Sequence, residues 1–261
     1  MPELPDVEHM RRVWSRHGPG RVVERVVTLD PAIVRNAAPD ELDAALHGQR
    51  LEEPQRIGKW LIAVTTGPSL LLHFGMTGDL TWAATSDARH RHDRVVVELD
   101  RGELRYRNMR KFGGVWLARD GQELRAATGP LGPDALSVET TSFLELLGRR
   151  RGKVKAALMD QSLISGVGNL VADEILWHAG IHPARRIEEL GPGERARLFS
   201  TMQRVLTRWV EGYGSLPRGW LIHARGRTDR GCPRCGTPLS RTVVGGRTTY
   251  FCPRCQSVEG T

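Results

Sequence analysis

The first residues of the chain offer an unusual nucleophile. The chain begins Met1-Pro2-Glu3, and a small second residue normally allows removal of the initiator methionine, which would leave Pro2 with a free secondary amine. An α-amino group has a pKa of about 8, so a useful fraction is unprotonated at neutral pH. Such an amine can attack an aldehyde-like sugar carbon and form an iminium, an electron sink for elimination, with Glu3 as general acid and base. The alternative is that Pro2 is merely a processed terminus.

Four cysteines form two pairs with the spacing of a metal site. Cys232-x2-Cys235 and Cys252-x2-Cys255 are separated by sixteen residues, which is typical of a structural zinc ribbon with four thiolate ligands. Two disulfides are the alternative, but the N-terminus lacks a signal-peptide pattern, and disulfides are rare in chains that remain inside the cell. The sequence therefore predicts one structural Zn²⁺, with no cysteine left for catalysis or redox sensing.

A glycine-bearing connection between two helical patterns could bind phosphate. Gly166 and Gly168 permit a tight turn, and Asn169 is expected to be the N-cap of the following helix. Amides at a helix start carry the positive end of the helix dipole and can bind a phosphate oxygen. Residues 149–155 read Arg-Arg-Arg-Gly-Lys-Val-Lys, five cations in seven positions. The alternative is a solvated basic loop followed by an ordinary helix connection.

The elements that must position the terminal amine are a helix and a set of strands. Pro5 suits a first helical turn, and an apolar stripe followed by Gly18 predicts a helix that pins the terminus; the stripe comprises Val7, Met10 and Trp14. Short β-rich runs separated by turn signals then predict a β-sandwich, with a helix over 40–46. The runs are 22–23, 26–27, 60–64, 70–74, 95–99 and 104–107.

The second half of the chain has a different pattern. A Pro/Gly-rich joint at 129–134 marks the domain boundary. Helical periodicity follows over 143–150, 153–160, 170–179 and 194–213. Between the cysteine pairs, residues 243–250 predict a hairpin with Gly245-Gly246 at its tip and Arg247 beside it.

The charge distribution favours a nucleic-acid partner. The net charge is +8 and the pI about 9.9, and residues 218–261 alone carry +6 from eight Arg and two acids. Four thiolates and a zinc ion sum to −2, which leaves this segment at +4. No apolar run reaches membrane-spanning length.

Two motifs together resemble one family. Met-Pro-Glu-Leu-Pro-Asp-Val-Glu at residues 1–8 is similar to the N-terminus of the formamidopyrimidine-DNA glycosylase and endonuclease VIII family, and residues 161–174 resemble its helix–two-turn–helix motif. The resemblance runs nearly end to end. It implies a bifunctional DNA glycosylase and AP lyase of base excision repair, in which the terminal proline is the nucleophile and DNA lies between two domains.

The resemblance also assigns roles to single residues. It implies that Pro2, Glu3, Lys59, Glu174 and Arg247 serve catalysis, with Lys59 beginning a strand next to Gly58. Met76, Arg110 and Phe112 match three residues that fill the gap left by an extruded nucleotide. The remaining matches to DNA-binding positions are His92, Arg151, Lys155 and Asn169, and Arg247 is expected to reach phosphates as well. Taken alone, His92 would be a surface histidine, Met76 core filler, and Glu174 a helix-surface carboxylate.

The sequence departs from the family pattern at the start of the first helix, in one loop, and in the length of one segment that bears on the substrate. Asp6 stands where the family usually has Glu, and Asn108-Met109 replaces Asp-Pro. The interval from Tyr213 to Arg230 is short, whereas members that act on 8-oxoguanine carry a longer lesion-capping loop there. We therefore expect weak activity on 8-oxoguanine, and ring-opened purines and oxidised pyrimidines both stay open as substrates.

These observations predict an α+β multidomain protein. The expected parts are an N-terminal catalytic β-sandwich with flanking helices (1–125), a hinge (126–139), a helix–two-turn–helix DNA-binding domain (140–215) and a zinc ribbon (216–261). Double-stranded DNA with damaged bases or abasic sites is the expected partner of a monomer in the cytoplasm, at the nucleoid, and not at a membrane. One rival is a non-catalytic damaged-DNA-binding protein, which the joint presence of Pro2, Glu3 and Lys59 disfavours. Another is a ribosome-associated RNA-binding module, which the three gap-filling residues disfavour.

Overall fold

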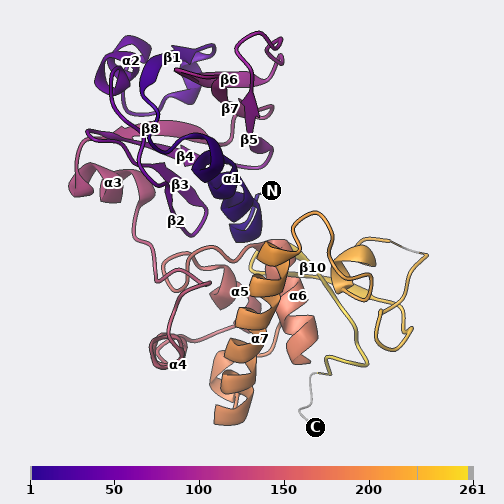
Figure 1. Ribbon diagram of the computed structural model, residues 1–261. Helices are drawn as coiled ribbons and strands as arrows, with labels where there is room; N and C mark the ends of the chain where they lie inside the picture. Colours follow the sequence, from indigo (N-terminus) through magenta and orange to yellow (C-terminus); the bar gives the residue numbers. More distant parts are fainter. Residues whose placement is uncertain (1, 228, 258–261) are drawn as a thin grey trace. The chain divides into compact units, whose positions relative to one another are not determined.

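In the computed structural model, which describes residues 2–227 and 229–257, the chain divides into two units, 1–130 and 131–261. The ribbon in Figure 1 shows strands concentrated in the first unit and helices in the second. Each unit has its own buried core, as expected for parts of this size.

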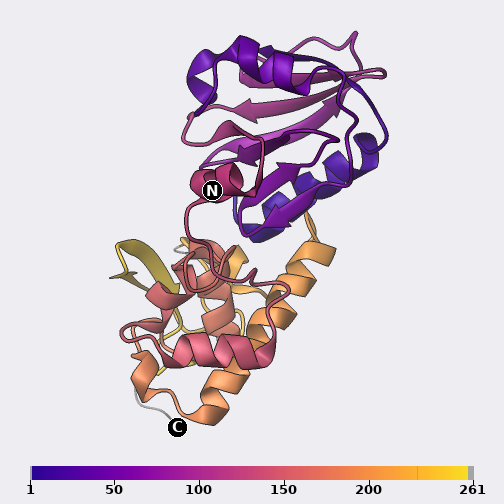
Figure 2. The ribbon, with the colours of Figure 1, turned by 90° about the vertical axis from the view of Figure 1, so that its left-hand side faces the viewer.

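The first unit contains two four-stranded antiparallel sheets, seen from a second side in Figure 2. One sheet has the order β1 (Val23–Thr28), β6 (Asp93–Leu99), β7 (Glu103–Asn108) and β5 (Gly78–Ala83). The other has the order β2 (Gln55–Ile57), β3 (Trp60–Ala63), β4 (Ser69–His73) and β8 (Gly114–Ala118). The predicted β-sandwich is confirmed, although β2, β5 and β8 were not among the expected runs.

Helix α1 (Leu4–His17) packs across members of both sheets. Its stripe of Val7, Met10 and Trp14 is at most 3 % exposed and joins the same hydrophobic cluster as the sheet residues. Burying each such side chain contributes about 1.5–3 kcal/mol, so the core fixes the helix firmly. The helix ends at Gly18, as predicted.

Three shorter helices complete the first unit. The 3₁₀ helix η1 (Pro31–Ile33) precedes α2 (Pro39–Leu46), which contacts β1 and confirms the expected helix. Helix α3 (Gly121–Thr128) contacts β8 and was not expected. The Asp120 carboxylate accepts hydrogen bonds from the N–H groups of Gln122 and Glu123 at 2.8 Å, which is the N-cap that starts α3.

Helix α6 (Asn169–Ala179) is the central element of the second unit, and most of its residues are buried. It contacts α5 (Val154–Met159), α7 (Pro192–Glu211), the 3₁₀ helix η3 (Leu221–His223) and a strand of the ribbon. Helix α4 (Thr140–Gly148) packs against α7, and η2 (Ile187–Glu189) contacts α4. The four predicted helices are therefore present, with ends that differ by a few residues.

The start of α6 corrects the expectation for Asn169. The N-cap is Gly168, and Asn169 is the first helical residue. Gly166 has a φ of 110°, which favours glycine, whereas Gly168 has an extended conformation with a φ of −120° that other residues also adopt. The tight turn therefore depends on Gly166.

The ribbon hairpin pairs β9 (Ser240–Val244) with β10 (Arg247–Phe251). Gly245 and Gly246 both have positive φ, 58° and 71°, as a two-residue type I′ turn requires. Arg247 pairs with Val244 directly at the turn, so the predicted hairpin is confirmed.

Within the part of the chain that the structure describes, no helix is both long enough and apolar enough to cross a bilayer.

Candidate active site and nucleic-acid interface

Pro2 precedes the start of a helix that is held by a capping hydrogen bond and by the core. Glu3 is the N-cap of α1 and is 2 % exposed, and its backbone N–H donates to the Asp6 carboxylate at 2.8 Å. This is one half of a capping box, and the shorter Asp side chain satisfies it where the family usually has Glu. Pro2, half-buried, is thus attached to a helix whose other residues are anchored in the core. The arrangement places Pro2, whose nitrogen would be a terminal amine after removal of Met1, directly before a buried glutamate.

Lys59 lies in a turn and does not begin a strand, which corrects the sequence expectation. Gly58 and Lys59 form the two-residue connection between β2 and β3, flanked by the pair Ile57 and Trp60. Gly58 has a φ of 58° and Lys59 does not have positive φ, the pattern of a type II′ turn. Lys59 is therefore presented at the tip of a tight hairpin.

An ion pair ties this hairpin to α1. Arg56 donates to the Glu8 carboxylate at 3.0 Å and to the Gly58 carbonyl at 2.9 Å, so one guanidinium connects the helix with the turn that carries Lys59. Burial alone would raise the Glu8 pKa, but hydrogen bonds and charge from Arg11 and Arg56 more than compensate and hold the pKa below its usual value. Glu8 therefore stays ionised at neutral pH.

The three gap-filling candidates lie on two adjoining loops. Met76 belongs to the β4–β5 loop (74–77), and Arg110 and Phe112 belong to the β7–β8 loop (109–113). Met76 is 40 % exposed and Phe112 60 %, and the Arg110 guanidinium carbon lies 4.9 Å from the centre of the Phe112 ring. The exposure contradicts the alternative that Met76 fills the core. We call these two segments the wedge loops.

His92 lies at the entry to β6, half-buried rather than fully on the surface. Its ring nitrogen Nδ1 is 3.2 Å from the Arg94 guanidinium, and its carbonyl accepts the N–H of Asn108 at 2.9 Å. Burial and the neighbouring Arg91 and Arg94 lower the His92 pKa, which favours the neutral ring.

The second unit contains a buried polar network, which we call the ionic hub: Lys155, Asn169, Asp173, Arg225, Thr248 and Thr249. The Lys155 ammonium lies 2.7 Å from each of three oxygens, those of Asp173, Asn169 and Thr249, and the residue is 0 % exposed. A direct phosphate contact by Lys155 does not fit this burial. The ammonium instead joins α5, α6 and β10 and fixes the Asn169 side chain, which also donates to the Thr248 carbonyl at 3.1 Å.

Asp173 completes the hub from the next turn of α6. Besides Lys155, its carboxylate accepts from Arg225 at 2.9 Å and from the backbone N–H of Tyr250 at 3.2 Å. Arg225 also donates to the Thr248 carbonyl at 3.1 Å, and its guanidinium carbon lies 4.8 Å from the centre of the Tyr250 ring. The hairpin that carries Arg247 is thus attached to α6 through charged groups, while Arg247 and Arg151 are themselves exposed.

Glu174 is 1 % exposed, so the helix-surface alternative is wrong. Its two carboxylate oxygens accept the backbone N–H groups of Leu221 and Ile222 at 3.0 and 2.8 Å, and one of them lies 3.2 Å from His178. The carboxylate therefore anchors η3 and the segment around it.

The four cysteines are close enough to bind one metal ion. Their sulfur atoms all lie within 4.8 Å of one another, with shorter separations of 3.5 to 3.9 Å. A tetrahedral zinc site with Zn–S bonds of about 2.3 Å places its sulfurs about 3.8 Å apart, so the four thiols fit Zn²⁺ and not two disulfides. The Trp177 indole N–H donates to the Cys232 sulfur at 3.3 Å, which attaches this site to α6.

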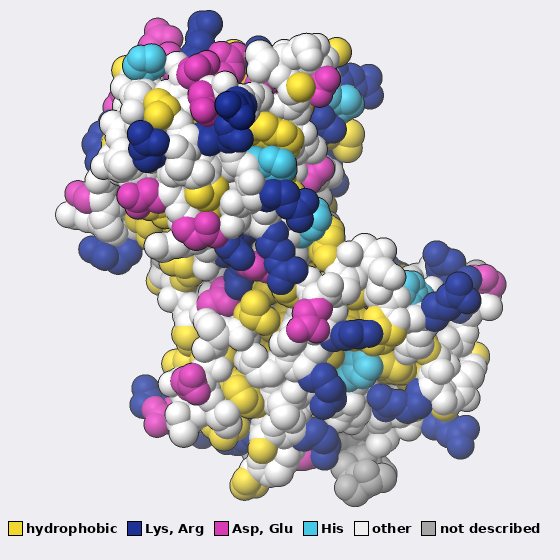
Figure 3. Space-filling view, in the orientation of Figure 1, with side chains coloured by type: hydrophobic (Ala, Val, Ile, Leu, Met, Phe, Trp, Pro, Cys, Tyr) yellow, Lys and Arg dark blue, Asp and Glu magenta, His cyan; other side chains and the backbone are white. Residues whose placement is uncertain are grey.

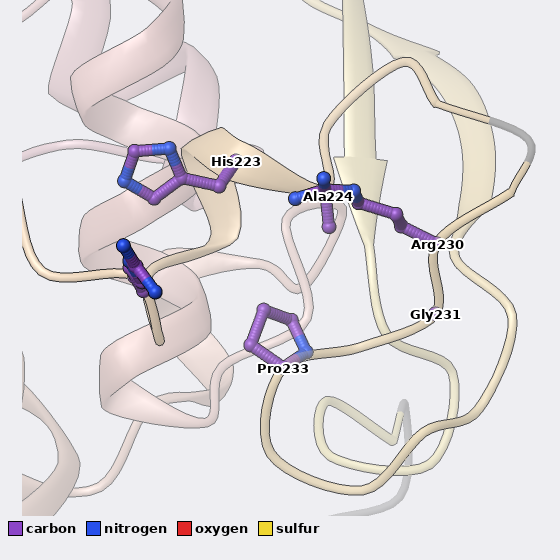
Figure 4. A pocket seen from close by; sticks show the side chains of 6 residues that line it. His223, Ala224, Arg230, Gly231 and Pro233 are labelled. Carbon is purple, nitrogen blue, oxygen red and sulfur yellow. The ribbon is translucent and has the colours of Figure 1, made fainter.

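A cavity of about 270 Å³ lies between η3 and the first cysteine pair. Figure 4 shows the His223 ring on one side, Pro233 on another, and the Arg230 side chain extending toward Ala224. With Arg218, the cavity has three cationic or hydrogen-bonding side chains, which suit oxygen acceptors. Figure 3 shows many Lys and Arg side chains on the visible face of the second unit, in agreement with the positive charge of residues 218–261.

Several residues that position these groups escaped the sequence analysis. Asp173 adjoins Glu174 and had no motif of its own, and the Glu8–Arg56 pair spans 48 positions, beyond any local pattern. Asn108 was noted only as a departure from the family pattern. The one signal in the sequence for Asp173 was its place, one turn after the glycine-bearing start of the helix.

Three family models match consecutive parts of the chain. Residues 1–115 match the formamidopyrimidine-DNA glycosylase N-terminal domain, residues 131–217 the helix–two-turn–helix domain of the same family, and residues 232–258 a zinc finger found in this glycosylase and in isoleucyl-tRNA synthetase. The matches leave few residues outside them.

Whole-length relatives agree with these matches. The formamidopyrimidine-DNA glycosylase of Herpetosiphon aurantiacus is 38 % identical over 98 % of this chain and 100 % of its own length. That of Symbiobacterium thermophilum is 39 % identical over 99 % of this chain and 90 % of its own.

Two solved structures are similar as well. The Fpg protein of Lactococcus lactis in complex with DNA containing N7-benzyl-Fapy-dG has a TM-score of 0.87 at 29 % identity, covering 98 % of this chain and 100 % of its own. A MutM protein in complex with DNA containing carbocyclic 8-oxo-G also has a TM-score of 0.87, at 30 % identity with the same coverage.

Proposed function

The chain belongs to the formamidopyrimidine-DNA glycosylase family, and from this premise we propose how its own residues carry out the family's reaction. It is a DNA glycosylase of base excision repair, and AP lyase activity is part of the family function. Its partner is double-stranded DNA with damaged bases or abasic sites, and the zinc-finger match and the cysteine cluster support one structural zinc.

Pro2 is the nucleophile in this proposal. The unprotonated amine attacks C1′ of the extruded nucleotide, the bond from C1′ to the base breaks, and the base leaves with the electron pair and a proton. Glu3 moves protons to and from the sugar, and opening of the sugar ring gives an iminium between the Pro2 nitrogen and C1′. Loss of a proton from C2′ then expels the 3′ phosphate and nicks the strand. Lys59 supplies positive charge from its hairpin tip.

The single observation that carries this proposal is the fixed terminus. Glu3 is buried as the N-cap of α1, Asp6 accepts its N–H, and the Glu8–Arg56 pair links the same helix to the Lys59 turn. These contacts lie within one unit and orient three groups of the proposed chemistry. If Pro2 were only the product of methionine removal, with no chemical role, these contacts would not be needed.

Borohydride reduction during turnover tests the assignment. Reduction should convert the iminium into a stable protein–DNA adduct, and peptide mapping should locate the DNA on Pro2. An N-terminal extension that leaves Pro2 internal should strongly reduce trapping. An undiminished adduct on an internal lysine would overturn the assignment.

The remaining site residues divide between base extrusion and phosphate binding. We propose that Met76, Arg110 and Phe112 fill the gap left by the extruded nucleotide, as their exposure and adjacency allow. We propose that Arg151, Arg247 and His92 contact phosphates directly. Lys155 and Asn169 act through the ionic hub by fixing α6 and the hairpin, and Glu174 acts through η3 rather than on the sugar.

The choice of lesion should depend on segment 213–230, part of which is held by Glu174. This segment is shorter than the lesion-capping loop of family members that act on 8-oxoguanine, so it can make fewer contacts with an extruded base. The sugar chemistry at Pro2 and Glu3 does not depend on these contacts. Although a similar MutM protein has been solved with DNA containing carbocyclic 8-oxo-G, we propose that this chain excises 8-oxoguanine opposite cytosine slowly and cuts abasic sites well. Single-turnover rates at equal enzyme concentration, with abasic, ring-opened and 8-oxoguanine duplexes, test this. Equal rates on abasic and 8-oxoguanine duplexes would contradict it.

We further propose that the protein acts as a monomer in the cytoplasm, at the nucleoid. Its DNA substrate and the basic charge of the second unit support this location. Size-exclusion chromatography with light scattering tests the oligomeric state.

A further inference from the structure

The bases of the two wedge loops lie opposite one another. Both loops cross between the sheets, because β4 and β8 belong to one sheet and β5 and β7 to the other. His73 pairs with Gly114 across β4 and β8, and Gly78 pairs with Asn108 across β5 and β7. The loops therefore start and end at fixed positions, and their tips extend beyond the sheets.

Asn108, the last residue of β7, joins the two loops with one side chain. It is 0 % exposed, and its amide nitrogen donates to the Phe74 carbonyl at 3.1 Å, at the start of the first loop. Its amide oxygen accepts the N–H of Lys111 at 2.9 Å, in the middle of the second loop. A carboxamide can do both, whereas an ionised carboxylate only accepts.

The amide nitrogen also bonds to a tyrosine that supports the same junction. Asn108 donates to the Tyr106 hydroxyl at 2.8 Å, and this hydroxyl donates to the His73 carbonyl at 2.9 Å. A Cβ at Gly113 would lie 2.0 Å from that carbonyl and 2.8 Å from the Asn108 amide nitrogen, so the backbones are in close contact. Only glycine fits there.

The second loop needs this support because its backbone is strained. Lys111 has a φ of 55°, the one positive φ of a residue other than glycine in the part of the chain that the structure describes. Such a conformation is unfavourable for a residue that has a Cβ, and the N–H group of Lys111 donates to the Asn108 amide oxygen. A third contact, from the N–H of Arg110 to the Thr77 hydroxyl at 3.0 Å, joins the loops nearer their tips.

This junction also accounts for a departure from the family pattern. Where the family usually has Asp-Pro, this chain has Asn108 followed by Met109, which is 52 % exposed and lacks the fixed φ of a proline. The bond from the Asn108 amide to the first loop provides a constraint that the proline would otherwise provide within the second loop.

We propose that Asn108 is a positioning residue that holds Met76, Arg110 and Phe112 in the arrangement needed to enter a base stack. It touches neither the sugar nor the base. The inference rests on the proposed role of those three residues. Without the amide bond to Phe74, the two tips would lose their common arrangement, and base extrusion from a duplex would become slower and less selective for the opposite base.

Asn108→Asp tests the inference, because the variant keeps the acceptor and the shape of the side chain but loses both donors. The same abasic site should be supplied in a duplex and in a single strand, where no stacked gap has to be filled. We expect the single-turnover rate of strand cleavage in the duplex to fall by at least about tenfold, because the bonds of the amide nitrogen to Phe74 and to Tyr106 are both lost. The single-strand rate should change less than about twofold.

Thr77→Val provides a second variant at a half-buried position. It removes the contact with the Arg110 N–H and a longer bond, of 3.4 Å, from the Thr77 hydroxyl to the Asn108 amide oxygen, but it keeps the bond from Asn108 to Phe74. We expect a smaller loss on the duplex than for Asn108→Asp. Phe112→Ala serves as the reference for the wedge itself. If Phe112→Ala slows duplex cleavage but Asn108→Asp does not, the inference about Asn108 is wrong and the proposed function stands. If Phe112→Ala leaves the duplex rate unchanged, the proposed wedge fails, and the inference with it. An equal loss on duplex and single strand for both Asn108→Asp and Thr77→Val would show general damage and also overturn the inference.

Discussion

The wedge loops of the first unit and the ionic hub of the second fix exposed residues by different means. At the wedge loops, a neutral amide, a phenol and a hydroxyl bond to backbone groups, and the side chains of Met76 and Phe112 are exposed. In the hub, a buried carboxylate lies 2.7 Å from an ammonium and 2.9 Å from a guanidinium. One site is assembled from neutral groups and the other from charges.

The difference fits the two tasks proposed for these regions. Each neutral hydrogen bond contributes about 1 kcal/mol, so a loop held by a few of them is positioned yet can adjust as it enters a base stack. Removing one partner of a buried ion pair costs about 3–5 kcal/mol, so the hub holds the hairpin and α6 rigidly for binding to a regular phosphate backbone. The comparison predicts that removing a buried charge of the hub lowers the free energy of unfolding more than removing one neutral hydrogen bond at the wedge loops.

The largest effect is expected at the zinc site. Cys252→Ser should lose the metal ion and unfold the ribbon, because metal binding supplies the folding free energy of such a module. Zinc content by mass spectrometry of the native protein should fall from one ion per chain to none, and affinity for undamaged duplex should fall with it. Retention of zinc by the variant, or two disulfides in the unaltered protein, would contradict this.

The next largest effect is expected at the centre of the hub. Asp173→Asn leaves the buried Lys155 ammonium without the Asp173 carboxylate and should lower the free energy of unfolding by about 3–5 kcal/mol. The matched control is Asp173→Asn combined with Lys155→Met, which removes both charges and should recover part of the loss in urea unfolding. If the double variant is no more stable than the single one, charge burial is not what makes the hub sensitive.

In the first unit, the free energy of unfolding should depend on pH through His73, a neutral group at the base of a wedge loop. Burial first, and the charge of Lys59 second, lower the His73 pKa from 6.5 to about 4, and its Nδ1 accepts the Gly75 N–H at 3.3 Å. Below pH 6.5 the unfolded chain binds a proton that the folded chain does not. The free energy of unfolding should therefore fall by about 3 kcal/mol between pH 6.5 and 4. In urea titrations at a series of pH values, His73→Gln should flatten this dependence. If the free energy of unfolding of the variant falls with pH as steeply as that of the unaltered protein, His73 is not the group responsible.

The smallest effect is expected at the hairpin tip. Arg247→Ala removes one exposed cation, so binding to undamaged duplex should lose about 0.9 units from the slope of log K against log salt concentration. Arg254→Ala, an exposed arginine outside the hairpin, is the matched control. If the two variants have the same slope, Arg247 does not contact a phosphate.

How much the sequence predicted depended on how local each signal was. The cysteine cluster, the ribbon hairpin and the buried stripe of α1 follow from local spacing, and the structure contains all three. The short strands β2, β5 and β8 were missed because their residues gain stability from neighbours in the sheet rather than from their own pattern.

The site was predicted as a set of residues but not as a set of contacts. The sequence indicated Lys155 and Asn169 as phosphate ligands, yet the partners that bury Lys155 are up to 94 positions away. The N-cap of α6 was placed one residue late, since glycine and asparagine both suit that position. Asn108 was visible as a departure, but its link to Phe74 follows only from the pairing of four strands.

One measurement tests the central claim that the chemistry depends on Pro2 in the first unit, whereas Arg247 in the second unit serves binding to the phosphate backbone. Pro2→Gly and Arg247→Ala should be compared on one abasic duplex, with Kd determined at equilibrium and adduct formation followed under borohydride at saturating protein. We predict that Pro2→Gly binds with a Kd near that of the unaltered protein but forms little adduct, whereas Arg247→Ala binds more weakly and forms adduct at close to the normal rate. Normal adduct formation by Pro2→Gly, or a parallel loss of binding and chemistry in both variants, would contradict this division.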